Sequence, residues 1–235
     1  MKIPILELFG PTIQGEGMVI GKKTLFIRTS GCDYRCAWCD SSFTWDGTGK
    51  PTMMTPEQII TQIDALNQNR ARHVTLSGGN PAIHKGLGEV VDRLHASGYD
   101  VAIETQGTIW NDWLTKVDEI TISPKPPSST MTTDFQQLAS FIERLPKERT
   151  TLKVVVFDAK DFQFAEKVHQ TFPMLDFYMQ PGNDDLQETD ERKMTHHLIE
   201  SYERLIERAM ASTILKDVRV LPQLHALVWG NRRGV

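Results

Sequence analysis

Three cysteines within eight residues have the most distinctive chemistry in this sequence. Cys32, Cys36 and Cys39 are the only cysteines of the chain, and their spacing is C-x3-C-x2-C. Thiolates are soft anionic ligands suited to iron–sulfur clusters and to zinc. Structural zinc sites and electron-transfer [4Fe–4S] clusters normally have four protein ligands, so three cysteines leave one metal position open. Since an open position is typical of substrate or cofactor binding, the loop predicts a cluster with one exchangeable site.

Two simpler interpretations of the cysteine loop remain open. A histidine elsewhere in the chain would complete a Cys3His zinc site, and three free thiols need no metal at all. The sequence contains seven histidines, but their positions in or beside predicted strands, helices and loops single out none as a ligand. We assign no role to His84 or His225, which lie near predicted loops.

Composition excludes several classes of protein. Hydrophobic content of 40% and aromatic content of 8% suit a water-soluble protein with an ordinary core. The net charge of −4 argues against nucleic acid as the main partner. No apolar run reaches the length of a membrane span, and no signal peptide is evident. Clustered cysteines without others favour the cytoplasm over an oxidising compartment.

The cysteine loop directly follows a predicted strand, and strands alternate with helices along the rest of the chain. Thr55, Pro56 and Gln58 form a helix start with a capping box. The predicted strands are 3–9, 24–30, 73–76, 99–104, 119–123, 152–157, 175–180 and 218–221, and the predicted helices are 56–66, 87–94, 134–144, 161–171 and 190–211.

This alternation predicts an α/β fold with a parallel sheet wrapped by helices. At 235 residues the chain suits one domain, 1–235, and an incomplete barrel of about six units, because a full eight-unit barrel typically needs about 250 residues. The polar segments that follow the strands then meet at one mouth of the barrel. We expect residues 10–17 to form a turn-rich loop, and Arg28 to lie either on a solvated face or in the site.

The cysteine loop, with Trp38 before its last cysteine, resembles that of the radical S-adenosylmethionine (SAM) superfamily. The ordered set of motifs is similar to the 7-carboxy-7-deazaguanine synthase family over nearly the whole chain. These motifs are Ile13-Gln14-Gly15-Glu16-Gly17, Arg28, the cysteine loop, Ser77-Gly78-Gly79-Asn80-Pro81, Glu104-Thr105-Gln106-Gly107, Ser123-Pro124-Lys125 and Gln180-Pro181. One departure is Asn80, which stands where many superfamily members have Glu.

The resemblance implies a modified partial (β/α) barrel of the radical SAM type, and it implies the reaction. Such enzymes are lyases that convert 6-carboxy-5,6,7,8-tetrahydropterin to 7-carboxy-7-deazaguanine and ammonia, in queuosine and related 7-deazapurine biosynthesis. They use one [4Fe–4S] cluster, SAM and Mg²⁺, and reductive cleavage of SAM starts the reaction. A homodimer and an electron donor such as flavodoxin are also implied.

The resemblance further implies roles for individual residues, without assigning a catalytic acid or base. Cys32, Cys36 and Cys39 would ligate the cluster, and Ser41 would supply a hydroxyl to Mg²⁺. The expected SAM-binding residues are Gly79, Ser123, Pro124, Lys125, Gln180, Pro181, Gly182 and Asn183. The expected substrate-binding residues are Ile13, Gln14, Gly15, Glu16, Arg28, Ser77 and, through its terminal carboxylate, Val235.

Two rival functions follow from the same cysteines. A glycyl-radical activase can share the C-x3-C-x2-C loop, but the Gln-Gly-Glu and Ser-Pro-Lys segments argue against it. A non-catalytic iron–sulfur or zinc module would need a fourth cysteine or a well-placed histidine and would not cleave SAM.

Overall fold

The computed structural model describes residues 1–186 and 188–235. A nine-stranded sheet runs through it, in the order β3-β1-β2-β4-β5-β6-β7-β8-β9. The strands are β1 (Ile3–Ile13), β2 (Lys23–Thr29), β3 (Thr52–Met54), β4 (His73–Gly78), β5 (Asp100–Thr105), β6 (Glu119–Ile122), β7 (Thr150–Val156), β8 (Asp176–Pro181) and β9 (Arg219–Val220).

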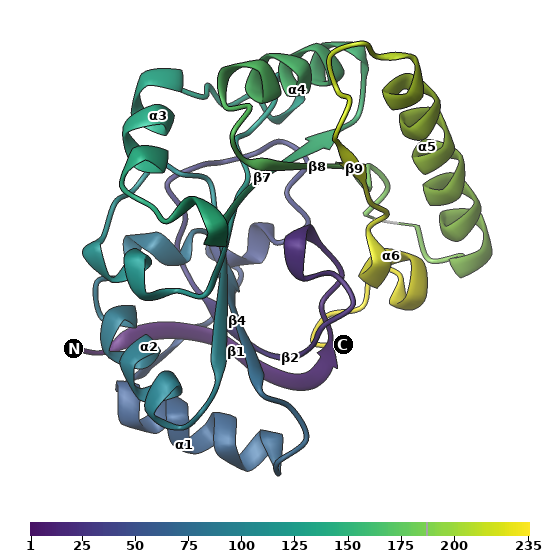
Figure 1. The fold of residues 1–235 in the computed structure, drawn as a ribbon. Helices are drawn as coiled ribbons and strands as arrows, with labels where there is room; N and C mark the ends of the chain where they lie inside the picture. Colours follow the sequence, from purple (N-terminus) through teal and green to yellow (C-terminus); the bar gives the residue numbers. More distant parts are fainter. Residues whose placement is uncertain (187) are drawn as a thin grey trace.

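Helices connect most neighbouring strands and cover the outer side of the curved sheet (Figure 1). They are α1 (Pro56–Asn67), α2 (Leu87–Ala96), α3 (Phe135–Glu143), α4 (Ala159–Thr171), α5 (Glu191–Ala211) and α6 (Leu224–Trp229). The predicted capping box starts α1: the Thr55 hydroxyl accepts from the Gln58 amide, and the Gln58 side chain accepts from the Thr55 amide. The predicted alternation of strands and helices is confirmed.

The sheet is mostly parallel, and it does not close. Strands β2 and β4 to β9 run parallel to one another, whereas β1 pairs antiparallel with β2 and β3. In the part of the chain that the structure describes, β3 and β9 are the two edges. The expected partial barrel is therefore what the chain forms.

The main core lies between the sheet and its outer helices. Branched apolar side chains fill it, including Ile27, Leu76, Ile103 and Val154, none of which is more than 1% exposed. All seven residues of β7 are buried, as expected of a parallel strand covered on both faces. Among the described residues, no helix has the length and apolar character needed to cross a bilayer.

Three local elements differ from the prediction. Strand β1 continues to Ile13 through part of the expected loop, because Thr12 and Ile13 pair with the start of β2. The short strand β3 was missed. Helix α6 was missed as well. Strand β3 and helix α6 are both too short for a hydrophobic periodicity to be recognised in the sequence.

Candidate functional site

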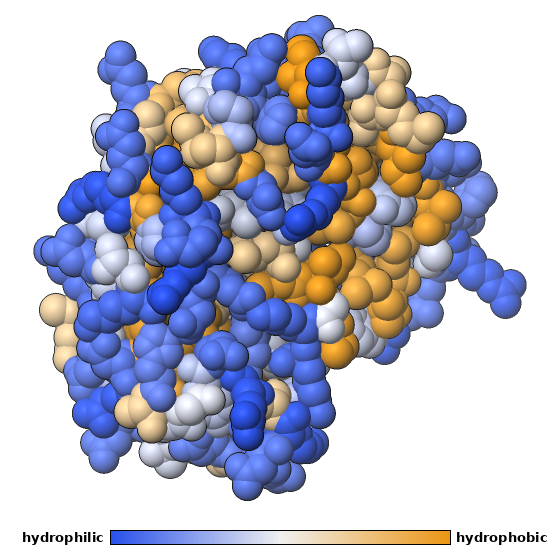
Figure 2. All heavy atoms as spheres, viewed as in Figure 1, coloured by the Kyte–Doolittle hydropathy of each residue, from blue (hydrophilic) through white to orange (hydrophobic). Residues whose placement is uncertain are grey.

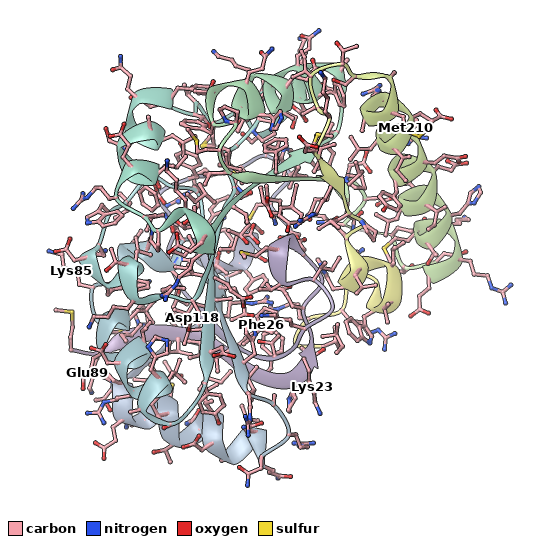
Figure 3. All side chains as sticks on the ribbon, viewed as in Figure 1. Lys23, Phe26, Lys85, Glu89, Asp118 and Met210 are labelled. Atoms are coloured by element: carbon pink, nitrogen blue, oxygen red, sulfur yellow. The ribbon has the colours of Figure 1, made fainter. Side chains whose placement is uncertain are left out.

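A cavity of about 220 Å³ opens where the parallel strands end. It brings together residues from the start, middle and end of the chain. Thirteen of the predicted site residues line it: Ile13, Gln14, Gly15, Glu16, Arg28, Cys32, Cys36, Cys39, Ser41, Ser77, Gly79, Lys125 and Val235. Phe26, which stacks on Phe9 at a centroid distance of 4.7 Å, also lines it and lies inside the curve of the sheet (Figure 3).

The cysteine loop leaves β2 and is held by backbone hydrogen bonds. The Gly31 amide donates to the Thr44 carbonyl at 2.7 Å, and the Ala37 amide donates to the Ser129 carbonyl at 3.0 Å. Cys36 is buried, and the other two cysteines are half-buried. All three side chains therefore approach the cavity from one short, fixed segment.

Two side-chain N–H groups lie beside the cysteine sulfurs. Gln106 Nε2 lies 3.1 Å from Cys32 Sγ, and Trp45 Nε1 lies 3.4 Å from Cys39 Sγ, so both can donate N–H···S hydrogen bonds. Burial is the main cause that raises the pKa of each free thiol, to about 11 for Cys36. A bound metal centre would supply the positive charge that stabilises thiolates at this position.

The distances between the three cysteine sulfurs distinguish a [4Fe–4S] site from a zinc site. The ligating atoms of Glu16, Asp40 and His225 all lie within 4.8 Å of one another. Among the described residues, no other three His, Cys, Asp or Glu side chains come as close together. The three cysteines do not form such a group. Ligands of one tetrahedral zinc lie about 3.8 Å apart, whereas the cysteines of a cubane cluster each bind a different iron. The donor set thus fits a [4Fe–4S] cluster.

Arg28 points into the cavity rather than onto a solvated face. Its guanidinium lies 5.1 Å from the Phe9 ring centroid and 5.4 Å from that of Phe43. Its Nη1 lies 3.3 Å from Glu7 Oε2. Two aromatic rings and a carboxylate fix a planar cation there, which is a suitable geometry for binding a carboxylate.

The segment after β1 meets α6 at the cavity wall. The Leu224 amide donates to the Gly15 carbonyl at 3.1 Å. A Cβ on Gly15 would lie 2.6 Å from His225 Nδ1, so only glycine permits this approach. His225 lines the cavity with its Nδ1 3.8 Å from Glu16 Oε1. Sequence reasoning missed His225, because its helix was not predicted.

A buried lysine joins two carboxylates of the cavity wall. Lys153 Nζ on β7 lies 2.5 Å from Glu16 Oε2 and 2.6 Å from Glu104 Oε1. Burial alone would raise the pKa of Glu16, but Lys153 and His225 outweigh it and hold that pKa far below its ordinary value. Burial likewise opposes the charge of Lys153, but Glu104 and Glu16 raise its pKa above the usual range.

Lys153 and the position of Glu104 were also missed from the sequence. The available signal was a lysine within the apolar run Leu152-Lys153-Val154-Val155-Val156-Phe157. A charge inside a strand predicted to be buried on both faces needs partners, but the sequence does not say which.

The expected SAM-binding residues are only partly gathered. Lys125 lines the main cavity and donates to Ser123 Oγ at 3.0 Å. Gly182 and Asn183 line a smaller cavity of about 80 Å³ beside Lys125 and Glu104. The remaining four, Ser123, Pro124, Gln180 and Pro181, line neither of these two cavities. The side chain of Gln180 is fully buried, and within the described residues neither of its amide atoms has a hydrogen-bond partner.

The end of the chain reaches the same cavity. Gly234 and Val235 line it, and the C-terminus lies beside the end of β1 in Figure 1. The Arg233 side chain contacts Glu7, and its guanidinium lies 3.4 Å from the Phe43 ring centroid. The tail is therefore held at the wall of this cavity.

Comparison with known proteins agrees with this geometry. Residues 26–155 match the model of the radical SAM superfamily. The chain is 55% identical to the 7-carboxy-7-deazaguanine synthase of Bacillus cereus, an alignment that covers 100% of this chain and 99% of the relative. It is 50% identical to the synthase of Bacillus subtilis, covering 99% and 98% of the two chains.

Solved structures show the same likeness. The crystal structure of QueE from Escherichia coli matches with a TM-score of 0.66 and 27% identity, covering 94% of this chain and 95% of that one. SuiB of Streptococcus suis bound to S-adenosylmethionine matches with a TM-score of 0.53 at 14% identity, covering 84% and 50% of the two chains, and so shares the fold. From its cysteine geometry, its partial barrel and these relatives, the chain is a radical SAM enzyme of the 7-carboxy-7-deazaguanine synthase family.

Proposed function

We propose that this enzyme converts 6-carboxy-5,6,7,8-tetrahydropterin to 7-carboxy-7-deazaguanine with release of ammonia. The observation that carries the proposal is the convergence of the three cysteines, Arg28 and Val235 on one cavity. A [4Fe–4S] cluster on the cysteines would supply the electron for reductive cleavage of SAM, which starts the radical chemistry.

The side chains of the cavity bind and orient the substrate in this proposal. Arg28 binds the pterin carboxylate through its planar fork, supported by Glu7. Glu16 and the backbone of Gln14 and Gly15 accept and donate hydrogen bonds at the ring. The terminal carboxylate at Val235 accepts hydrogen bonds from the pterin's amino and ring N–H groups.

The residues on the other side of the cavity bind SAM. The backbone of Gly79 meets the SAM amino group beside Cys32, and Lys125 approaches from β6. Gly182 and Asn183 provide the wall of the adjoining small cavity. We propose that Ser123, Pro124, Gln180 and Pro181 complete the SAM site. Figure 2 shows hydrophilic and hydrophobic residues side by side on this face of the molecule.

We propose a Mg²⁺ site at the Ser41 hydroxyl. Support comes from the hard oxygen ligands close by, since Glu16 and Asp40 have ligating atoms within 4.8 Å of each other. Ser41 lines the same cavity as both. Ser41→Ala should raise the Mg²⁺ concentration needed for half-maximal stimulation of turnover. If neither added Mg²⁺ nor a chelator changes the turnover of the parent protein, this site is contradicted.

The partners are also proposals. An electron donor such as flavodoxin would reduce the cluster, and the cytoplasm is the compartment that suits an oxygen-sensitive centre. We propose a homodimer, for which the exposed apolar side chains of Ile199 on α5 and Val228 on α6 offer surface. Sedimentation of the parent protein and of Ile199→Glu tests this assembly, since a dimer formed through that face should dissociate.

The decisive experiment is anaerobic reconstitution with iron and sulfide, followed by assay with SAM and carboxytetrahydropterin. We expect 7-carboxy-7-deazaguanine and ammonia, and no product when the pterin is omitted. Cys32→Ala, Cys36→Ala and Cys39→Ala should each lose the cluster absorbance and all turnover, because the chain has no spare cysteine. An intact cluster that cleaves SAM but forms no deazaguanine would overturn the proposed substrate.

A further inference from the structure

Lys153 is a charged residue at the centre of the barrel. Its side chain is 1% exposed. Its neighbours on β7, Leu152 and Val154, belong to the core between the sheet and the helices. Because side chains alternate along a strand, Lys153 must point to the inner face, toward the cavity. Burying an ammonium group costs desolvation free energy, so the ammonium must be paired with anionic partners. These partners therefore indicate its role.

Those partners come from two segments that are far apart in the sequence. Glu16 lies between β1 and β2, and Glu104 lies on β5, yet both carboxylates contact the same Nζ atom. The second oxygen of Glu16 accepts from Gln223 Nε2 at 2.9 Å. The Glu104 side chain is 30% exposed and lines both cavities, so its carboxylate remains partly open to a ligand.

Without the ammonium, two carboxylates would face one another in a poorly solvated wall. Like charges at such a distance raise the pKa of one partner, which then binds a proton. An ionised carboxylate only accepts hydrogen bonds, whereas a protonated one donates. The charge of Lys153 therefore determines whether this wall presents acceptors or a donor to the bound molecule.

We infer that Lys153 is a positioning residue that keeps Glu16 and Glu104 ionised and oriented as a pair of acceptors for the N–H groups of a planar heterocyclic substrate. The identity of that substrate as the carboxypterin rests on the proposed function. Lys153 itself contacts no substrate in this account and acts through the two carboxylates.

The test compares Lys153→Met with the parent protein after reconstitution. Methionine keeps the length of the apolar stem and removes the charge. We expect unchanged iron content, because Lys153 contacts none of the three cysteines. Pterin affinity, measured by anaerobic equilibrium binding, should fall about 10- to 100-fold, because each hydrogen bond to a charged group contributes about 1.5–3 kcal/mol.

Two further variants keep the test independent of folding. Lys153→Met combined with Glu104→Gln restores the net charge of the cluster, so its melting temperature should recover toward that of the parent. Its pterin affinity should stay low, since an uncharged amide replaces one of the two carboxylate acceptors. A matched control is Lys22→Met, which removes the exposed ion pair with Glu119 at the opposite ends of the strands and should bind pterin like the parent.

The outcomes distinguish this inference from the proposed function. Parent-like pterin affinity in Lys153→Met overturns the role of Lys153 alone. Recovery of both stability and affinity in the double variant shows a purely structural ion pair and overturns it as well. A parent protein that cleaves SAM but binds no pterin overturns the proposed substrate, and the role of Lys153 with it.

Discussion

Arg233 donates two hydrogen bonds to one oxygen of Glu7, from Nε at 3.1 Å and from Nη2 at 2.5 Å. The other oxygen of Glu7 lies 3.3 Å from Arg28. Glu7 thus connects the last residues of the chain to the side chain that we expect to bind the substrate carboxylate. Phe43, which lies against both guanidinium groups, completes this connection.

Removing the Arg233 side chain should therefore release the tail from β1. In Arg233→Ala we expect the KM for the pterin to rise about fivefold, because a partly exposed ion pair contributes about 1 kcal/mol. Cluster content should not change. Arg93→Ala, which removes an exposed pair with Glu89 on α2, is the control. A parent-like KM in Arg233→Ala would mean that the tail does not need this contact.

Deleting Gly234 and Val235 tests the terminal carboxylate directly. The KM should rise while iron content stays at the parent level, because both residues line the cavity but neither touches the cysteine loop in our account. A C-terminal extension of a few residues should have a similar effect, since it displaces the carboxylate. If both proteins bind and turn over the pterin normally, the tail has no role in binding.

Arg28→Lys should not behave as a conservative substitution. A lysine ammonium is a compact charge that cannot form the two-pronged contact with a carboxylate. It would also lose the stacked position between Phe9 and Phe43. We expect kcat/KM for the pterin to fall about 10- to 100-fold, from the loss of one charge-assisted hydrogen bond. Iron content and SAM binding should be unaffected; wild-type kinetics would remove Arg28 from the site.

The N–H···S contacts predict a change in the reduction potential of the cluster. Hydrogen bonds to cluster sulfurs are one of the factors that set this potential. Gln106→Leu and Trp45→Phe each remove one donor from a cysteine sulfur. Both variants should have a lower potential in a redox titration followed by electron paramagnetic resonance, because reduction adds negative charge that the donors stabilise. An unchanged potential in both would show that these contacts are absent in the loaded enzyme.

Gly79 should tolerate no side chain. A Cβ there would lie 2.3 Å from the Gly31 carbonyl oxygen and 2.6 Å from Cys32 Cβ. Gly79→Ala should therefore displace the cysteine loop and reduce iron content after reconstitution, with little change in the far-ultraviolet circular dichroism. Gly86→Ala is the control. The two atoms nearest to its Cβ would be side-chain carbons of Ile3, the closer one at 3.0 Å. Full iron loading of Gly79→Ala would contradict the close approach.

The sequence predicted the barrel because its signals are local. Capping residues around Thr55 and the buried apolar run around Val154 depend on near neighbours, and the structure contains both elements. The cysteine loop was recognisable for the same reason, since its three ligands lie in one segment.

The contacts between charged residues inside the site could not be predicted from local sequence patterns. Glu16 and Lys153 are 137 residues apart, and no pattern in either segment indicates the other. His225 lies on a six-residue helix that docks through contacts with Gly15. The assignments of individual residues to SAM, Mg²⁺ and the pterin remain predictions, which the experiments above test.

The unclosed sheet also determines how the cavity can be reached. Helix α6 covers the wall beyond β9, and it packs through Ala226 and Leu227 on Met194 and Leu198 in a cluster separate from the main core. Opening that wall requires one short helix to undock from α5 and from Gly15, and no strand ladder has to separate. Amide hydrogen exchange should therefore be faster in α6 than in β5 to β7, and ligand binding should slow it in α6 first.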